Sequence, residues 1–444
     1  MNRRTFIKTA AASALALNGF ACRARVPARS QKPNIVLIMA DDLGYECIGA
    51  NGGESYQTPV LDKLAANGVR FEHAYAQPLC TPTRVQLLTG IYNVRNYTDF
   101  GVLDKNETTF ANLFKNAGYA TCIVGKWQLG GGVQGPNHFG FDDYCLWQLT
   151  PGRTDSEGRD TRYPNPKLNV NGSVMDYKNG EYGPDVVSDY ACDFIQKNQD
   201  TPFLLYYPMI LTHCPFAPTP DSEDWNPEDK GSLSYKGDPR YFEDMVRYMD
   251  KMVGKLIATL ESCGLRENTL IIFTGDNGTD EPIVSILNGR RVAGAKGEMT
   301  NAGTRVPLIA GWPGVIPTGT VCRDLVDFSD FFPTLCDAAD IPIPENLNID
   351  GRSFLPQVMG KKGKPREWSY CWYSRNGKSA NARVFARTRR YKLYQTGEFY
   401  DIQEDVPEQK PLKQENLNDH QLKTRAMLNK VIKRYQGMRK QSLN

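Results

Sequence analysis

The chain alternates continuous apolar runs with longer segments in which apolar residues recur every three or four positions. Residues 35–40 and 269–273 are apolar runs of strand length, and this uninterrupted pattern is typical of strands buried on both faces of a sheet. Residues 185–197 and 239–262 show helical spacing instead. Further helices are predicted between residues 58 and 68 and between 108 and 118, and further strands at 120–124 and 203–207. This alternation predicts an α/β fold built on a large, mostly parallel central sheet.

The last quarter of the chain has a different pattern. Residues 341–365 are rich in Pro, Gly and Lys and predict a boundary between a first domain at 32–340 and a smaller C-terminal subdomain at 341–444. Beyond this boundary, antiparallel strands and a final helix are predicted at 368–374, 383–387, 391–394 and 419–435. Within the first domain, residues 151–184 are rich in Gly, Pro and Asn and predict a long surface insertion that shapes a cleft. The C-terminal part is therefore expected to be an α+β unit on an antiparallel sheet.

Residues 1–30 have the layout of a twin-arginine export signal, with Arg3 and Arg4 ahead of an apolar run at residues 9–20. That run is too short to cross a bilayer, so no transmembrane span is expected. The signal predicts an exported protein, periplasmic or extracellular in a bacterium, with the twin-arginine export machinery as a partner. Cleavage after Ala28 and lipid attachment at Cys22 are two alternative ways in which the signal could end.

The overall charge gives no sign of a polyanionic partner. The chain has 53 Lys and Arg residues against 50 Asp and Glu residues, and six of the basic residues lie in the predicted signal. This balance does not favour a nucleic acid or a membrane surface as a partner. Eleven cysteines are scattered without the paired spacing of a zinc site and are mostly expected to be buried thiols. Any affinity for an anionic ligand must therefore come from a local site.

Oxygen-bearing side chains follow two of the predicted strands. Asp41 and Asp42 come directly after the first apolar run, and Asp276 and Asn277 come shortly after the run at 269–273. Each pair alone is typical of a helix cap or a turn. Because ligand sites in open α/β sheets lie at the carboxyl ends of strands, the two pairs are expected to converge there. Converging carboxylates repel each other unless a cation lies between them, and oxygen ligands suit calcium or magnesium better than zinc.

A short segment in the first domain carries the most specific signal. Residues 80–84 read Cys-Thr-Pro-Thr-Arg, and residues 88–90 read Leu-Thr-Gly. This segment resembles the signature of the formylglycine-dependent sulfatases, Cys-x-Pro-x-Arg followed by Leu-Thr-Gly. Other segments match in the same order, among them Gly125-Lys126-Trp127, His213 with Pro215-Phe216, Gly275-Asp276-Asn277-Gly278, and Lys296 with Gly303-Thr304-Arg305. The resemblance covers residues 33 to about 411 and implies an alkaline-phosphatase-like α/β sandwich with its catalytic domain at 32–340.

The resemblance also implies a reaction and a role for each matched residue. It implies a sulfuric ester hydrolase in which a maturase oxidises Cys80 to formylglycine, whose hydrated gem-diol is the nucleophile. Arg84 would hold the nucleophile, and His213 would act as general acid. Lys126 and Lys296 would contact the sulfate and stabilise its developing charge. The implied ligands of a calcium ion, with magnesium less favoured, are Asp41, Asp42, Cys80, Asp276 and Asn277.

One position departs from the family pattern. The family usually has a histidine after the Lys-Trp pair, and this chain has Gln128 there. In the family that histidine is expected to remove a proton from the nucleophile so that sulfate is expelled. Gln128 can form a hydrogen bond with the nucleophile but cannot take a proton at ordinary pH. Slower turnover, a different base, or specialisation for another ester are the resulting expectations, and activity is still expected.

Side chains near the predicted loops favour a sulfated carbohydrate as the substrate. The aromatic candidates for sugar stacking and the arginine candidates for gripping further sulfates are Trp127, Trp147, Tyr97 and Trp372, and Arg162, Arg375 and Arg383. Two alternatives stay open: a phosphodiesterase or phosphonate monoester hydrolase of the same fold, and a catalytically silent glycan-binding relative. Gln128 motivates the silent relative, whereas the intact Cys80 segment argues against it.

Overall fold

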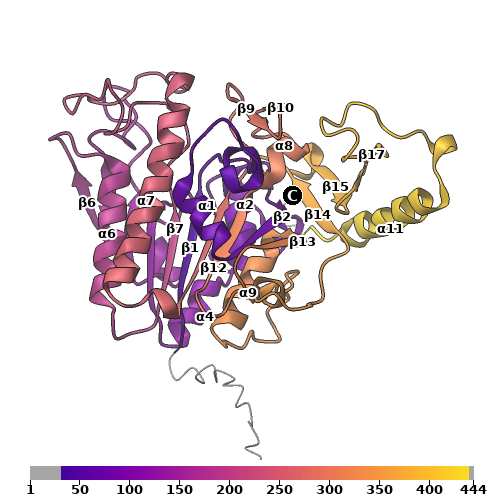
Figure 1. The fold of residues 1–444 in the computed structure, drawn as a ribbon, viewed down its shortest axis with the longest axis horizontal. Helices are drawn as coiled ribbons and strands as arrows, with labels where there is room; N and C mark the ends of the chain where they lie inside the picture. Colours follow the sequence, from indigo (N-terminus) through magenta and orange to yellow (C-terminus); the bar gives the residue numbers. More distant parts are fainter. Residues whose placement is uncertain (1–31, 440–444) are drawn as a thin grey trace, which may run out of the picture. The chain divides into compact units, whose positions relative to one another are not determined.

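The structure, a computed structural model, describes residues 32–439. The centre of its main sheet is β1 (Asn34–Ala40), which pairs in parallel with β7 (Phe203–Pro208) on one side and β8 (Thr269–Gly275) on the other. Beyond β7 the parallel order continues with β3 (Ala120–Lys126) and β4 (Asp143–Trp147). Figure 1 shows these strands running side by side between two groups of helices. The predicted parallel core of the sheet is confirmed.

The other side of the sheet is closed by strands of mixed direction. Antiparallel β12 (Leu308–Gly311) lies between β8 and β2 (Val69–Tyr75), and antiparallel β11 (Arg305–Val306) also pairs with β2. The last strand on this side is β13 (Thr320–Asp327), which pairs with β2 in parallel. The sequence analysis assigned no strand at β2, although its first four residues alternate between apolar and charged, a pattern typical of a half-buried strand.

The segment predicted as a surface insertion is only partly irregular. It contains β5 (Lys167–Val170) and β6 (Ser173–Asp176), which extend the main sheet from β4 as antiparallel strands. It also buries Asp160, Thr161 and Arg162. The segment is therefore less of a surface loop than predicted, because part of it forms the edge of the sheet. Its Arg153 and Arg162 line the pocket described below, in agreement with the predicted cleft.

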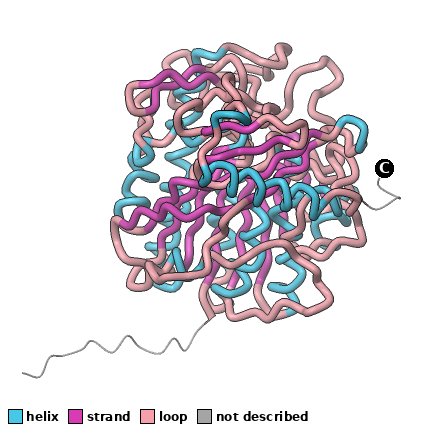
Figure 2. The backbone as a smooth tube through the Cα atoms, turned by 90° about the vertical axis from the view of Figure 1, so that its right-hand side faces the viewer, coloured by secondary structure: helices cyan, strands magenta, loops and turns pink. Residues whose placement is uncertain are grey.

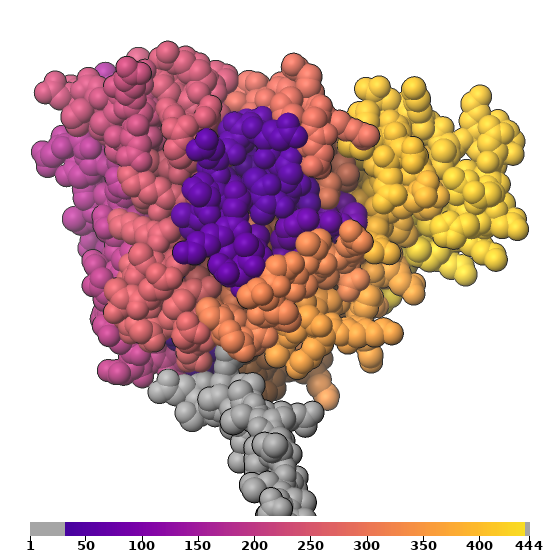
Figure 3. All heavy atoms as spheres, in the orientation of Figure 1, coloured from indigo at the N-terminus to yellow at the C-terminus, as the bar shows by residue number. Residues whose placement is uncertain are grey.

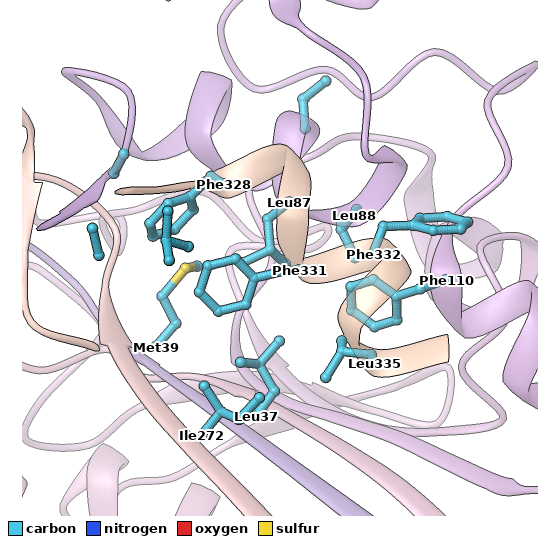
Figure 4. Close-up of a cluster of buried hydrophobic side chains, with 14 of the residues drawn as sticks. Leu37, Met39, Leu87, Leu88, Phe110, Ile272, Phe328, Phe331, Phe332 and Leu335 are labelled. Atoms are coloured by element: carbon cyan, nitrogen blue, oxygen red, sulfur yellow. The ribbon is translucent and has the colours of Figure 1, made fainter. Parts of the chain in front are cut away.

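Alternate residues of β1 face opposite layers of the fold. Leu37 and Met39 pack into one hydrophobic cluster with the helices α2 (Cys80–Thr89), α4 (Phe110–Asn116) and α9 (Phe331–Ala338). Figure 4 shows this layer, with aromatic and leucine side chains of the helices directed at the strand residues. The period of two along a strand places these residues on one face of the sheet.

The opposite face of the sheet forms the second layer. Val36 and Ile38 pack with helices α1 (Pro59–Ala66), α6 (Gly183–Lys197) and α7 (Phe242–Ser262). The fold is therefore a three-layer sandwich, with helices on both faces of the sheet, as Figure 1 shows. None of the helices in residues 32–439 is both long and apolar enough to cross a lipid bilayer.

The C-terminal part contains the predicted antiparallel sheet. Its strands are β14 (Ser369–Tyr373), β15 (Arg383–Arg387), β16 (Tyr391–Tyr394) and β17 (Phe399–Asp401), in that order. The last helix, α11 (Asp419–Tyr435), packs on β15 and β16 (Figure 2). In Figure 3 the surface of these C-terminal residues, in yellow, adjoins the orange segment that precedes them. Apolar residues of this part join the cluster of the first layer, and a domain boundary at 340 stays a prediction.

Short elements complete the described fold. They are α3 (Asn93–Asn96), α5 (Gly135–His138), α8 (Asn301–Thr304), α10 (Leu355–Val358), and the hairpin of β9 (Val284–Leu287) and β10 (Arg290–Ala293).

Candidate active site

Three neighbouring strands deliver charged residues to the same edge of the main sheet. The register aligns Ala40 of β1 with Gly275 of β8, so Asp41 and Asp276 leave their strands side by side. Lys126 is the last residue of β3, on the other side of β7. The predicted convergence at the carboxyl ends of the parallel strands is present in the structure.

Hydrogen bonds tie the two pairs of oxygen-bearing residues together. The backbone N–H of Asp42 donates to Asp276 Oδ1 at 3.0 Å, and Asn277 Nδ2 donates to Asp42 Oδ1 at 2.8 Å. Asp42 has φ of 62°, a left-handed conformation that is uncommon outside glycine. Strained residues of this kind cluster at functional sites, where the surrounding structure holds them in place.

Cys80 is the first residue of α2 and lies beside these carboxylates. Its Sγ and carboxylate oxygens of Asp41 and Asp276 all lie within 4.8 Å of one another. One turn further along the helix, Arg84 donates to Asp276 Oδ2 at 3.1 Å and to the carbonyl of Lys126 at 3.0 Å. Burial raises the pKa of the Cys80 thiol, although Lys126 acts in the opposite direction. The unmodified side chain is therefore a protonated thiol, which is a weak nucleophile.

Two lysines neutralise the aspartates that follow β1. Lys126 Nζ lies 2.7 Å from Asp41 Oδ2, and Lys296 Nζ lies 2.5 Å from Asp42 Oδ2. Burial alone would raise the pKa of Asp41, but Lys126 and Arg84 outweigh it and hold that pKa below its ordinary value. Burial, together with the charge of Asp41, raises the pKa of Asp276 to about 7. Protein cations therefore keep Asp41 ionised and leave the charge of Asp276 under-compensated.

The donor set of this cluster fits a hard divalent cation. Among the described residues, none donates a hydrogen bond to the buried oxygens Asp41 Oδ1 and Asn277 Oδ1. Buried polar atoms are normally paired, so two unpaired acceptors beside crowded carboxylates indicate a missing positive partner. Carboxylate and amide oxygens are ligands that calcium and magnesium prefer. The residues that could hold such an ion are Asp41, Asp42, Asp276 and Asn277, with the side chain at position 80 next to them.

His213 follows β7 and faces the same cluster. Its Nε2 lies 3.1 Å from Lys296 Nζ and 3.7 Å from Asp42 Oδ2. On the other side of the ring, Nδ1 lies 2.6 Å from Arg162 Nη1 and 2.5 Å from the carbonyl of Cys214. Burial, followed by the charges of Lys296 and Arg162, lowers the pKa of His213 well below its ordinary value. The imidazole is therefore neutral and lies next to a lysine ammonium group.

Gln128 occupies the position where the family has a histidine. Cys80 Sγ donates to Gln128 Oε1 at 3.2 Å, so the amide contacts the predicted nucleophile directly. Gln128 has φ of 51°, a left-handed conformation that is uncommon outside glycine. The structure thus places the departure from the family pattern in contact with Cys80.

Of the site side chains described so far, six line a pocket of about 390 Å³: Cys80, Lys126, Gln128, Arg162, His213 and Lys296. We call Cys80 and the charged residues clustered around it the pocket floor: Asp41, Asp42, Arg84, Lys126, Asp276 and Lys296. Cys80, Lys126 and Lys296 line the pocket itself. We call the residues at its upper wall the pocket rim: Phe100, Gln148, Arg153, Tyr235 and Arg375. The volume falls in the range of about 300–1,000 Å³ that is usual for small-ligand sites.

The aromatic and arginine residues that the sequence analysis named as candidates for contact with the substrate fall into two groups. Trp147, Arg162 and Arg375 line the pocket. Trp127, Tyr97 and Trp372 instead pack in the hydrophobic core, and Arg383 pairs with Glu298 outside the pocket lining. For the three aromatic residues a contact with substrate was the wrong expectation, because folding buries their rings. For Arg383, whose side chain is 50% exposed, the contact stays a prediction.

Sequence reasoning missed several residues of the rim. Gln148 has φ of 58°, and its Oε1 is buried without a hydrogen-bond donor among the described residues. Tyr235 is 49% exposed, with the guanidinium of Arg153 4.6 Å from its ring centroid. No spacing or composition marks these residues in the sequence, because loops far apart in the chain bring them together.

Comparisons with known proteins agree with this arrangement. The sulfatase family model matches residues 33–341, and a model described as N-sulphoglucosamine sulphohydrolase, C-terminal, matches residues 295–437. The mouse (Mus musculus) N-acetylgalactosamine-6-sulfatase is 34% identical, over 78% of this chain and 69% of that protein.

Two solved structures resemble the fold. Ps i-CgsB in complex with k-i-k-neocarrahexaose has a TM-score of 0.75 and 25% identity, covering 93% of this chain and 94% of that one. Phosphonate monoester hydrolase of Agrobacterium radiobacter has a TM-score of 0.68 and 20% identity, covering 92% and 96%, and shows the shared fold alone. The family match over most of the chain, on an alkaline-phosphatase-like sandwich, leads to one conclusion: this chain belongs to the sulfatase family and is a sulfuric ester hydrolase.

Proposed function

We propose that the protein hydrolyses sulfate esters of a carbohydrate, using formylglycine made from Cys80 and a calcium ion bound at the pocket floor. The observation that carries this proposal is the position of Cys80, at the start of α2 and among Asp41, Asp276 and Lys126. A protonated thiol there has no evident use as a nucleophile, whereas a hydrated aldehyde at the same position could attack the sulfur of a bound ester.

The modified side chain would supply the attacking hydroxyl, and the calcium ion would lower its pKa and neutralise sulfate oxygens. The chain's own residues have separate tasks. Arg84 holds the first turn of α2 against Asp276 and the end of β3, which fixes the position of residue 80. Lys126 and Lys296 place two ammonium groups at the base of the pocket, where they stabilise negative charge on the sulfate.

Lys296 and His213 form a proton-holding pair at the pocket wall. The ammonium group of Lys296 lies 3.1 Å from Nε2 of the neutral imidazole. A proton held between these two nitrogens is available to the leaving-group oxygen as the S–O bond breaks.

The rim supports a hydroxyl-rich substrate. The unpaired Oε1 of Gln148 is an acceptor that a sugar hydroxyl can satisfy, and the exposed ring of Tyr235 offers an apolar face to a sugar ring. The names of the similar proteins point the same way, since one is an N-acetylgalactosamine-6-sulfatase and another was solved with k-i-k-neocarrahexaose. A sulfated carbohydrate is therefore the proposed substrate class.

The decisive experiment combines mass spectrometry with hydrolysis assays. The peptide that contains Cys80 is analysed from protein made with and without a formylglycine-generating maturase, and both preparations are assayed on an aryl sulfate and a matched phosphate diester. Formylglycine at position 80 and sulfate release only after maturation are the expected results. A faster reaction on the phosphate diester would favour a phosphodiesterase, and a thiol at position 80 with no hydrolysis would favour a glycan-binding protein.

Export is a separate part of the proposal and rests on residues 1–30, which lie outside the described residues. Because the twin-arginine machinery carries folded proteins, the maturase would have to act on the chain before export. Replacement of Arg3 and Arg4 by lysine should retain the protein in the bacterial cytoplasm, measured by cell fractionation. Equal export of the variant and the original chain would contradict this route.

A further inference from the structure

The pocket carries more positive charge than a single sulfate ester requires. Five cationic residues line it, namely Lys126, Arg153, Arg162, Lys296 and Arg375. No Asp or Glu belongs to the described lining. The two lysines already face Asp41 and Asp42 at the floor, at 2.7 and 2.5 Å. The unexplained charge therefore lies on the three arginines.

On one side of the rim, two arginines share a single carboxylate. Arg162 is buried and donates from Nε to Asp160 Oδ1 at 2.8 Å and from Nη2 to Oδ2 at 3.0 Å. Arg153 Nη1 lies 3.7 Å from the same Oδ2, and its side chain is 37% exposed. Arg153 and Arg162 together have two positive charges, and Asp160 neutralises one of them. The remaining positive charge is assigned to Arg153, which lines the pocket and is the more weakly paired of the two arginines. The ring of Tyr235 supports this arginine from one face.

On the other side of the rim, Arg375 is exposed and forms no ion pair with any carboxylate of residues 32–439. Its backbone is fixed, because the Tyr97 hydroxyl donates to the Arg375 carbonyl at 2.9 Å and the turn closes with a hydrogen bond from Gly377 N to Ser374 O at 3.2 Å. Its guanidinium lies 5.2 Å from the ring centroid of Phe100. The Arg375 backbone is held in place, and its guanidinium lies beside the Phe100 ring. The planar set of N–H donors on this guanidinium is suited to bind a carboxylate or a sulfate.

We propose that Arg375 and Arg153 form a second anion subsite, so that the preferred substrate is a saccharide with a further anionic group beside the sulfate ester that is cleaved. The further group is a sulfate or a carboxylate, on the same sugar or on the adjacent one. This inference rests on the proposed function and adds the charge pattern of the substrate. The floor binds the ester that reacts, and the two arginines bind the group that does not.

The test measures selectivity on a panel of sugars. Enzyme with formylglycine at position 80 is assayed on sugars sulfated at each single hydroxyl and on the same sugars with a second sulfate. Sulfated disaccharides with a uronic acid form the other arm, with the carboxylate intact or reduced to the alcohol. Arg375→Gln and Arg153→Gln are compared with Arg247→Gln, a control on α7 whose side chain is 51% exposed outside the pocket lining.

We expect kcat/KM of the original enzyme to be about tenfold higher with the second anion than without it. Arg375→Gln should reduce this ratio about tenfold, mainly through KM, Arg153→Gln should reduce it by less, and Arg247→Gln should keep it. The arm that shows the preference identifies the anion as sulfate or carboxylate.

A ratio near one in the original enzyme, or an equal ratio in Arg375→Gln and Arg247→Gln, would overturn the second subsite. If an aryl sulfate is still hydrolysed in that case, the proposed sulfatase function stands. If the enzyme hydrolyses the aryl sulfate but none of the sulfated sugars, both the proposed carbohydrate substrate and the second subsite are rejected. No hydrolysis of either class by the formylglycine form would reject the proposed function itself.

Discussion

At the pocket floor every charged side chain is buried or nearly so and faces an opposite charge. At the rim, Arg375 is exposed and has no ion pair within residues 32–439, and Arg153 shares Asp160 with Arg162. Removing one partner of a buried pair leaves an uncompensated charge and costs several kcal/mol. Changing an exposed arginine usually has little effect on stability. We therefore expect changes at the floor to affect the reaction and the fold, and changes at the rim to affect mainly the choice of substrate.

The largest expected effect comes from the nucleophile itself. Cys80→Ala should lower kcat for an aryl sulfate by more than about 1,000-fold, because no hydroxyl nucleophile can form at position 80. The fold should persist, since the side chain loses only one sulfur atom. Cys263→Ala, a half-buried thiol beyond the end of α7, is the control and should keep full activity. Appreciable hydrolysis by Cys80→Ala would assign the chemistry to another group.

Removal of the metal should have the next largest effect. Treatment with a chelator should lower activity by about 100-fold or more, because the sulfate oxygens lose their main positive partner. Added calcium should restore activity and raise Tm, because an ion that binds only the folded chain stabilises it. Asp276→Asn should lose the rise in Tm, and Asp142→Asn, an exposed surface change, should keep it. A calcium response that survives in Asp276→Asn would move the ion away from the floor.

Gln128→His should increase activity. A histidine at this position, in contact with residue 80, can accept a proton where the amide cannot, and general bases contribute about 100-fold or more. We expect kcat to rise by about tenfold or more, with a new pH dependence near the pKa of the added imidazole. Histidine tolerates the left-handed backbone at this position. Gln128→Asn keeps an amide and is the control, and an equal increase in both variants would argue against proton transfer.

The smallest effect is expected at the rim. Gln148→Asn withdraws the unpaired amide oxygen from the pocket and keeps a residue that accepts positive φ. The ratio of kcat/KM for a sulfated sugar to that for an aryl sulfate should fall about fivefold, because one hydrogen bond to a sugar hydroxyl is lost. Steady-state kinetics on both substrates measure this ratio. An unchanged ratio would show that Gln148 does not contact the sugar.

The amino-acid pattern predicted the elements that lie fully in the core or have one clear apolar face. The runs that became β1 and β8 are apolar throughout because helices cover both faces of the sheet. The pattern missed α2, because all ten of its residues are buried and no polar face marks its period. The acceptor at the start of α1 also depends on the tertiary structure: Thr58 stands at the N-cap position without a side-chain cap, and Asp250 of α7 accepts the N–H groups of Val60 and Leu61.

The sequence by itself determined the family resemblance, the predicted nucleophile and the residues expected at the floor, because short motifs at strand ends and at a helix start carry them. The tertiary structure decided which loop residues meet at the rim, and of these residues only Arg375 was a candidate from the sequence. Gln148, Arg153 and Tyr235 lie in or near irregular loops, and Arg375 comes from a turn after β14. No local rule connects such positions, since they meet only after the sheet and the C-terminal part have packed together. Catalytic residues lie in short motifs because local backbone geometry is enough to position them. Substrate choice depends instead on surfaces to which distant segments of the chain contribute together.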